Sequence, residues 1–142
     1  AKIKAGSECT ALVQNIDYAP TYLDIAGIEK PDYMVGTSLV PLFGGETPRD
    51  WREYLYYHYY DYPAIHMVRR HDGVRDSRYK LIHFYNDIDV WELYDLQEDP
   101  HEMNNLYGKP SYEAVMKRMR DELYKLQKQY DDPVGIRFNV SD

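Results

Sequence analysis

The sequence has a single cysteine, Cys9, among 142 residues. One thiol excludes an intramolecular disulfide framework and any zinc site built from several thiolates. Apolar runs are short, and none approaches the roughly 20 residues that a membrane-spanning helix needs. Basic residues are in the minority, with 17 Lys and Arg against 24 Asp and Glu, so the net charge is -7. We therefore expect neither a membrane nor a nucleic acid as a partner.

The composition is otherwise that of a folded domain, with 44% hydrophobic and 29% charged residues. A chain of 142 residues can form one domain, or one domain with a piece of another. It opens on AKIKAGSECTALVQN, which has neither an initiator methionine nor the apolar centre of a signal peptide. We therefore expect a segment from within a longer protein.

The first 50 residues predict a short strand, one helix and an irregular loop. Leu12 and Val13 are the expected strand. The segment NIDYAPTYLDIAG predicts a helix, because Asn15 or Asp17 can cap its start and Gly27 can end it. Apolar positions at intervals of three and four predict one buried face of this helix, formed by Ala19, Tyr22, Leu23 and Ala26. Three prolines and three glycines in residues 28–50 predict the loop.

A run of aromatic residues then predicts strands. The stretch from Tyr54 to His71 holds six tyrosines and three histidines. Its first part, YLYYHYY, has strand propensity. Alternation places four of its side chains on one face of that strand, namely Tyr54, Tyr56, His58 and Tyr60. GVRDSRYKLIHFY predicts a hairpin with Ser-Arg as its turn, and VWELYDL predicts a further strand.

The clearest element is a helix over residues 112–130, with Ser111 as its expected cap. Its apolar stripe consists of Tyr112, Met116, Met119, Leu123, Leu126 and Tyr130. The DDP that follows ends this helix, and VGIRFNVSD is interpreted as a short strand or a disordered tail. The predicted fold class is therefore α+β, a small antiparallel sheet of about four strands packed by a long C-terminal helix. A strand–helix remnant of another layer precedes it.

Four motifs, in this order and at similar spacing, resemble the C-terminal region of type I, formylglycine-dependent sulfatases. They are NIDYAPTYLDIAGI, MVGTSLVPLFGG, RHDGVRDSRYKLIHF and ELYDLQEDPHEMNNL. The chain is most similar to bacterial glycan sulfatases of the group that includes N-acetylglucosamine-6-sulfatase and iduronate-2-sulfatase. The resemblance implies that residues 1–50 are the C-terminal end of an alkaline-phosphatase-like catalytic domain with its crossing loop. Residues 51–142 would be the sulfatase C-terminal subdomain.

The resemblance also implies sulfate-ester hydrolysis with a formylglycine nucleophile and a calcium ion. The family makes formylglycine from the Cys or Ser of a C/S-x-P-S/A-x-R motif. Cys9 stands in SECTALVQ, without the required proline and arginine, and no group of Asp and Asn matches the calcium ligands. We therefore expect no catalytic residue, metal ligand or cofactor in this chain, and no activity of the isolated chain. Formylglycine and calcium are expected in the full-length enzyme, which the family implies is periplasmic or secreted.

The resemblance places the aromatic strand and the loop after it beside the mouth of the substrate pocket. The candidate substrate-binding residues are His66 and His71, with His58, Arg69 and Arg70 behind them. An imidazole can exchange a hydrogen bond with a sugar hydroxyl, and a guanidinium can clamp a sulfate or carboxylate. The implied partners are a sulfated carbohydrate and the N-terminal catalytic domain.

Several of these residues have a structural alternative. His58 lies within a strand among tyrosines, so a hydrogen-bonded core position competes with ligand contact. Arg69 and Arg70 point opposite ways in an extended chain, so at most one faces a given pocket. A metal site of the three histidines fits no standard zinc spacing. For the whole chain, the alternative function is a stand-alone aromatic-rich module that binds a glycan or a protein, which a formylglycine motif upstream would exclude.

The chain departs from the resemblance at two carboxylates. Relatives commonly read HYGVRT where this chain reads HDGVRD. Asp72 and Asp76 would repel an anionic sugar near the pocket unless they pair with Arg69, Arg70 or Arg75.

Overall fold

The computed structural model describes residues 3–139, with Asn139 described by its backbone alone. Its helices and strands are α1 (Tyr18–Ile25), β1 (Leu55–Tyr59), β2 (His71–Arg75), β3 (Tyr79–Phe84), β4 (Val90–Asp95), α2 (Glu113–Gln129) and α3 (Pro133–Asn139). Short 3-10 helices lie at Asn15–Asp17, Val40–Gly44 and Pro110–Tyr112. The chain divides into two compact units, Ala1–Glu53 and Tyr54–Asp142. Along residues 3–139, every helix is too short or too polar to cross a membrane.

In the first unit, α1 forms where it is predicted. It ends as expected, because Gly27 takes a left-handed φ of 70° and the amide of Ile28 donates to the carbonyl of Leu23 at 2.9 Å. The strand expected at Leu12 and Val13 is not formed. A strand needs a neighbour for its backbone groups, and the described part of this unit contains no other strand.

Within the residues described, the predicted buried face of α1 is not buried. Tyr22 is 68% exposed and Ala19 is exposed as well. The buried positions are instead Pro20 and Thr21, and the Thr21 hydroxyl accepts the amide of Leu39 from the following loop at 2.8 Å. The loop therefore packs against a side of the helix that apolar periodicity does not mark.

Asp17 is the buried centre of the first unit. Its carboxylate accepts both Nη groups of Arg52 at 2.8 Å. It also accepts the backbone amides of Gln14 at 2.7 Å and Thr37 at 2.9 Å. One fully buried carboxylate thus joins the start of α1, the long loop and the end of the unit.

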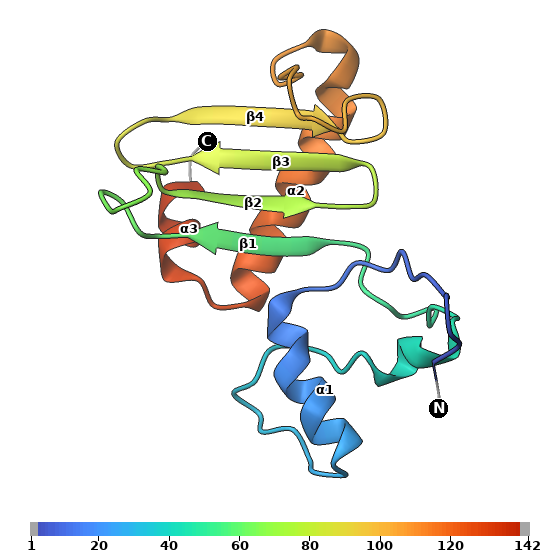
Figure 1. Ribbon diagram of the computed structural model, residues 1–142. Coiled ribbons are helices and arrows are strands. Elements are labelled where there is room, and N and C mark those ends of the chain that lie inside the picture. The colour runs from blue at the N-terminus through green and yellow to red at the C-terminus, as the bar shows by residue number, and fades with distance from the viewer. Residues whose placement is uncertain (1–2, 140–142) are drawn as a thin grey trace. The chain divides into compact units, whose positions relative to one another are not determined.

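The second unit is the predicted antiparallel sheet with helices on one face. The strand order is β1-β2-β3-β4, and α2 and α3 both lie behind the sheet in Figure 1. The core between sheet and α2 consists of Val74, Leu81, Leu93, Met119, Leu123 and Leu126. The predicted α+β fold is therefore confirmed, and so is the apolar stripe of the long helix.

The alternation predicted along β1 is also observed. Tyr56 stacks on Tyr130, on the helix side of the sheet, with ring centroids 5.9 Å apart. Tyr57 and Tyr59 contact the ring of His71 on the opposite face, at 5.8 and 5.5 Å. Tyr56 and the pair Tyr57 and Tyr59 lie on opposite faces because successive side chains of a strand alternate between its two faces.

The C-terminal helices differ from prediction in two respects. Ser111 does not cap α2, because it lies in the 3-10 turn that precedes Glu113. The predicted short strand or disordered tail is wrong for residues 134–139, which belong to α3, and residues 140–142 lie outside the described part. Asp132 explains this helix, since its carboxylate accepts the amides of Val134 and Gly135 at 3.0 Å. An Asp followed by Pro can start a helix as well as stop one.

Candidate functional site

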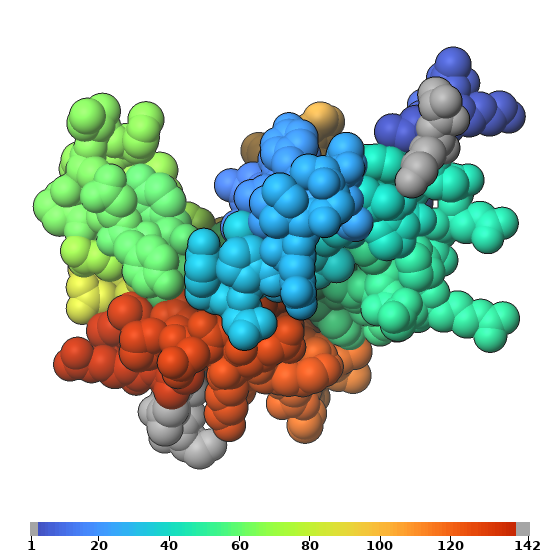
Figure 2. Space-filling model, turned by 90° about the horizontal axis from the view of Figure 1, so that it is seen from below, coloured from blue at the N-terminus to red at the C-terminus, as the bar shows by residue number. Residues whose placement is uncertain are grey.

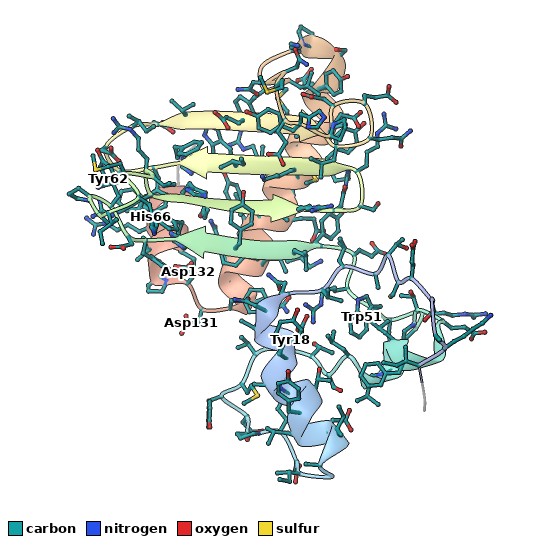
Figure 3. All side chains as sticks on the ribbon, in the orientation of Figure 1. Tyr18, Trp51, Tyr62, His66, Asp131 and Asp132 are labelled. Atoms are coloured by element: carbon teal, nitrogen blue, oxygen red, sulfur yellow. The ribbon has the colours of Figure 1, made fainter. Side chains whose placement is uncertain are left out.

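The predicted substrate-binding residues lie at one end of the sheet of the second unit. The β1–β2 loop, residues 60–70, carries three of them, and the other two lie on the strands that flank it. Figure 2 shows the green side chains of this loop gathered in a lobe beside the red surface of α3. Figure 3 labels Tyr62 and His66 within the loop, at the end of the sheet near Asp132.

His66 stands at the exposed tip of the β1–β2 loop. Its neighbours Ile65 and Met67 are 96% and 64% exposed. A tight turn forms the tip, where the amide of Met67 donates to the carbonyl of Ala64 at 3.0 Å and Met67 has a φ of 52°. The tip therefore offers an imidazole and adjoining apolar surface to a ligand.

Both arginines of the loop make contacts within the chain. Arg69 forms an ion pair with Asp87, and its guanidinium lies 5.4 Å from the ring centroid of Tyr62. The Nε of Arg70 donates to the backbone carbonyl of Tyr60 at 3.0 Å. In this arrangement the two guanidinium groups fasten the loop, and binding of a sulfate by either one stays a prediction.

His71 is the first residue of β2 and is partly buried. Its Nδ1 donates to the backbone carbonyl of Arg69 at 2.8 Å. Its ring stacks on Tyr59 at 5.5 Å and lies 5.1 Å from the ring of Phe84. The ring is thus held in one orientation, and contact of His71 with a sugar stays a prediction.

His58 is the centre of a buried hydrogen-bond network on the helix side of the sheet, where its side chain is 4% exposed. Its Nδ1 bonds to Asp132 and its Nε2 bonds to the hydroxyl of Tyr85. Asp132 also accepts the hydroxyls of Tyr56 at 2.5 Å and Tyr60 at 3.0 Å. This geometry matches the core position that the sequence left open for His58.

Burial and hydrogen bonds set the charges in this network. Burial lowers the pKa of His58, and its bond to Asp132 offsets only part of that effect. Burial alone would raise the pKa of Asp132, but bonds from Tyr56, the amide of Gly135 and His58 hold it at about 2. A neutral imidazole beside an ionised carboxylate carries its proton on Nδ1, so Nε2 accepts from Tyr85.

We expect acid to weaken the fold in two steps. Both pKa values are lower in the folded than in the unfolded chain, so the unfolded chain binds protons first as pH falls. Stability is lost below about pH 6.5 through His58, and between about pH 4 and 2 through Asp132. Thermal unfolding across this range should show a falling melting temperature, and His58→Gln should flatten the first range. A melting temperature that stays constant from about pH 7.5 to 5 would contradict this assignment.

Sequence reasoning missed Asp132 and Tyr85 as members of the network. The sequence DDP predicts a helix stop, although Asp before Pro is also the pattern of an N-cap followed by a first helical residue. Its partner His58 lies 74 positions away. Local patterns contain no signal for a pair at that separation.

The expectation for the two unusual carboxylates is corrected. Asp72 is fully buried and accepts the side-chain amide of Gln127 at 2.6 Å. Asp76 follows β2 at the end opposite the β1–β2 loop and pairs with Arg118 at 2.8 Å. The side chains Gln127 and Arg118 that bind them both belong to α2. The pleat turns Asp72 towards the helices, and Asp76 also accepts the amides of Arg78 and Tyr79 in the β2–β3 turn. Asp72 therefore belongs to the interior of the second unit and Asp76 to its β2–β3 turn.

The described part of the chain has no set of side chains suited to hold a metal ion or to form formylglycine. Within residues 3–139, no group of three or more His, Cys, Asp or Glu side chains could hold a metal ion. Cys9 is exposed and lies outside any formylglycine motif. These residues therefore do not fit the calcium site or the formylglycine that the family implies.

Comparison with known proteins gives consistent matches. The family described as N-sulphoglucosamine sulphohydrolase, C-terminal, matches residues 1–129. N-acetylglucosamine-6-O-sulfatase of Bacteroides thetaiotaomicron is 54% identical over 132 residues, which are 92% of this chain and 24% of that protein. A multifunctional alkaline phosphatase superfamily protein of Trinickia caryophylli is 34% identical over 115 residues, covering 73% and 22%. A solved structure of a protein in complex with its substrate, D-glucosamine-2-N,6-O-disulfate, matches with a TM-score of 0.90 and 50% identity, covering 99% and 28%.

Fold and sequence together place the chain in the sulfatase class, among alkaline-phosphatase-like structural neighbours. It belongs to the N-sulphoglucosamine sulphohydrolase C-terminal family. The resemblance carried by the four motifs is thereby confirmed. The chain spans about a quarter of the length of these relatives.

Proposed function

We propose that the chain is the C-terminal part of a sulfatase that hydrolyses sulfate esters of glycans, and that the β1–β2 loop forms part of its substrate-pocket wall. One observation carries the proposal. The loop presents the imidazole of His66 between the exposed Ile65 and Met67, in a chain 54% identical to N-acetylglucosamine-6-O-sulfatase. An imidazole can bond a ring hydroxyl while aliphatic groups pack against the C–H face of a pyranose. The substrate class would be a 6-O-sulfated glucosamine residue.

The nucleophile and the metal belong, in this proposal, to the part of the enzyme outside these residues. The described residues fit neither a metal ion nor formylglycine. An N-terminal catalytic domain would supply both, and this chain would shape and support the pocket. The division agrees with the share of about a quarter that the chain spans in its relatives.

The exposed face of α1 supports the assignment of residues 1–50 to the end of that catalytic domain. Tyr18, Tyr22 and Ile25 are 54%, 68% and 63% exposed. Their spacing of four and three places them on one face of the helix. A row of large apolar side chains of this kind marks an interaction surface. The occupant we propose is the upstream polypeptide of the same enzyme.

We expect His66→Ala in the full-length enzyme to raise KM about tenfold for N-acetylglucosamine-6-sulfate, because a polar contact worth about 1.4 kcal/mol is lost. The value of kcat should change little, since the imidazole meets the sugar and not the reacting sulfate. Steady-state desulfation kinetics with purified enzyme provide the measurement.

The matched control is His101→Ala, which removes another exposed histidine of the same unit, in the connection between β4 and α2. It should leave both KM and the melting temperature unchanged. Equal KM values for wild type and His66→Ala would contradict the proposal that the loop lines the substrate pocket. The proposal would also be contradicted if His66→Ala lost activity only in proportion to a loss of thermal stability.

A further inference from the structure

We propose that Asp132 is a positioning residue for substrate binding, because it holds the β1–β2 loop in place through Tyr60 although it lies at the start of α3. The inference rests on the proposed function, since it concerns substrate only if the loop lines the pocket. A positioning residue need not touch the sugar. It acts by fixing the geometry of the groups that do.

Asp132 is suited to this role because its own position is fixed. The residue is 5% exposed. One carboxylate oxygen, Oδ1, accepts the amides of Val134 and Gly135 at 3.0 Å, which ties it to the first turn of α3. The other, Oδ2, faces the sheet and accepts the hydroxyl of Tyr60 at 3.0 Å. A single buried group therefore connects the helix to the first residue of the loop.

Tyr60 joins both ends of the loop to this anchor. Its ring stacks on His58 with centroids 3.7 Å apart, which directs its hydroxyl towards Asp132. Its backbone carbonyl accepts the Nε of Arg70, the last residue of the loop, at 3.0 Å. The carbonyl of Arg70 in turn accepts the amide of Tyr85, just after β3, at 3.3 Å. The two ends of the loop therefore meet at Tyr60, whose hydroxyl is bonded to Asp132.

Between these ends the segment has one further attachment, the ion pair of Arg69 with Asp87. The tip of the loop depends on these attachments for its position. Ile65 and Met67 are exposed, and the backbone bonds of the segment are short-range, as between Met67 and Ala64. A segment with little buried surface takes its conformation from its attachments and opens readily when they fail. Displacement of Tyr60 should therefore reach His66, six positions further along the loop.

Three substitutions in the full-length enzyme separate positioning from general support. Tyr60→Phe removes the hydroxyl that connects Asp132 to the loop, and Asp132→Asn removes the carboxylate charge at nearly constant shape. Tyr56→Phe is the matched control, because its hydroxyl donates to the same oxygen at 2.5 Å from the middle of β1. For Tyr60→Phe and Asp132→Asn we expect KM for N-acetylglucosamine-6-sulfate to rise about tenfold with kcat nearly unchanged. Tyr56→Phe should lower thermal stability but leave KM at the wild-type value.

Hydrogen exchange supplies a readout that does not depend on activity. Three hydrogen-bonded amides report on the loop, those of Tyr62 and Met67 within it and that of Tyr85, which donates to the carbonyl of Arg70. They should exchange about tenfold faster in Tyr60→Phe and Asp132→Asn than in Tyr56→Phe. Exchange in this loop that is equal in Tyr60→Phe and Tyr56→Phe would overturn the proposal, whatever the kinetics. So would a KM effect of Tyr56→Phe as large as that of Tyr60→Phe.

The proposed function can fail separately from this inference. Faster loop exchange in Tyr60→Phe together with an unchanged KM in His66→Ala would show that the loop does not line the substrate pocket. Asp132 would then hold the loop but have no role in substrate binding. An altered KM in His66→Ala with unaltered exchange in Tyr60→Phe would support the loop as part of the pocket wall. It would contradict the positioning role of Asp132.

Discussion

Replacing Asp17 with alanine is expected to lower the free energy of unfolding by about 3–5 kcal/mol, as when one partner of a buried ion pair is removed. Arg52 would lose its bidentate carboxylate, and the amides of Gln14 and Thr37 would lose their acceptor. Each of these groups then bears an uncompensated cost of desolvation. Urea unfolding of the full-length protein measures the change.

Asp24→Ala is the matched control for this prediction. Asp24 is a carboxylate on the same helix, but it is exposed and accepts only the hydroxyl of Ser38, at 2.5 Å, among the contacts described. Its removal should cost less than about 1 kcal/mol. Comparable losses for the two variants would contradict the central role of Asp17 in the first unit.

Gly36→Ala should destabilise the first unit by about 3 kcal/mol through overpacking. A Cβ at this position would lie 2.0 Å from the carbonyl oxygen of Ile16 and 2.6 Å from its carbonyl carbon. Backbone atoms cannot rotate away as a side chain can, so the loop must move off the start of α1. The neighbouring Thr37 amide would then leave Asp17. Urea unfolding and exchange of the Thr37 amide report the two effects.

Gly44→Ala provides the corresponding control. A Cβ there meets nothing within 4 Å, and φ lies outside the left-handed region. Such a substitution is expected to be neutral or to stabilise by about 0.4–1 kcal/mol, because it reduces the freedom of the unfolded chain. A loss for Gly44→Ala equal to that for Gly36→Ala would show that close approach to Ile16 is not the cause.

The sheet and α2 could be predicted from the sequence because their signals are local. In YLYYHYY the alternation assigned Tyr56 and His58 to one face, and both lie on the helix side. The stripe containing Met119 and Leu123 identified the buried face of α2 for the same reason. Periods of two and 3.6 express the geometry of each element by itself.

The errors arose where burial depends on what lies opposite an element. The apolar residues of α1 followed a helical period, yet Tyr22 is 68% exposed within this chain. The sequence predicts Asp72 near the pocket because the adjacent His71 is a candidate site residue, but the pleat places Asp72 against Gln127. Of the candidate site residues, His66 lies on exposed loop surface and His58 in the core. Their spacing in the sequence contains no information that separates them.

The sequence by itself determined the four strands, the long helix and membership of the sulfatase family, because these depend on order and periodicity among neighbouring residues. Only the tertiary structure decided that Asp132 meets His58 and Tyr60 across more than 70 positions. It also decided that Asp17 binds Arg52. Such pairs form when separately specified elements pack together, and the energetic gain of burying a satisfied carboxylate appears only then.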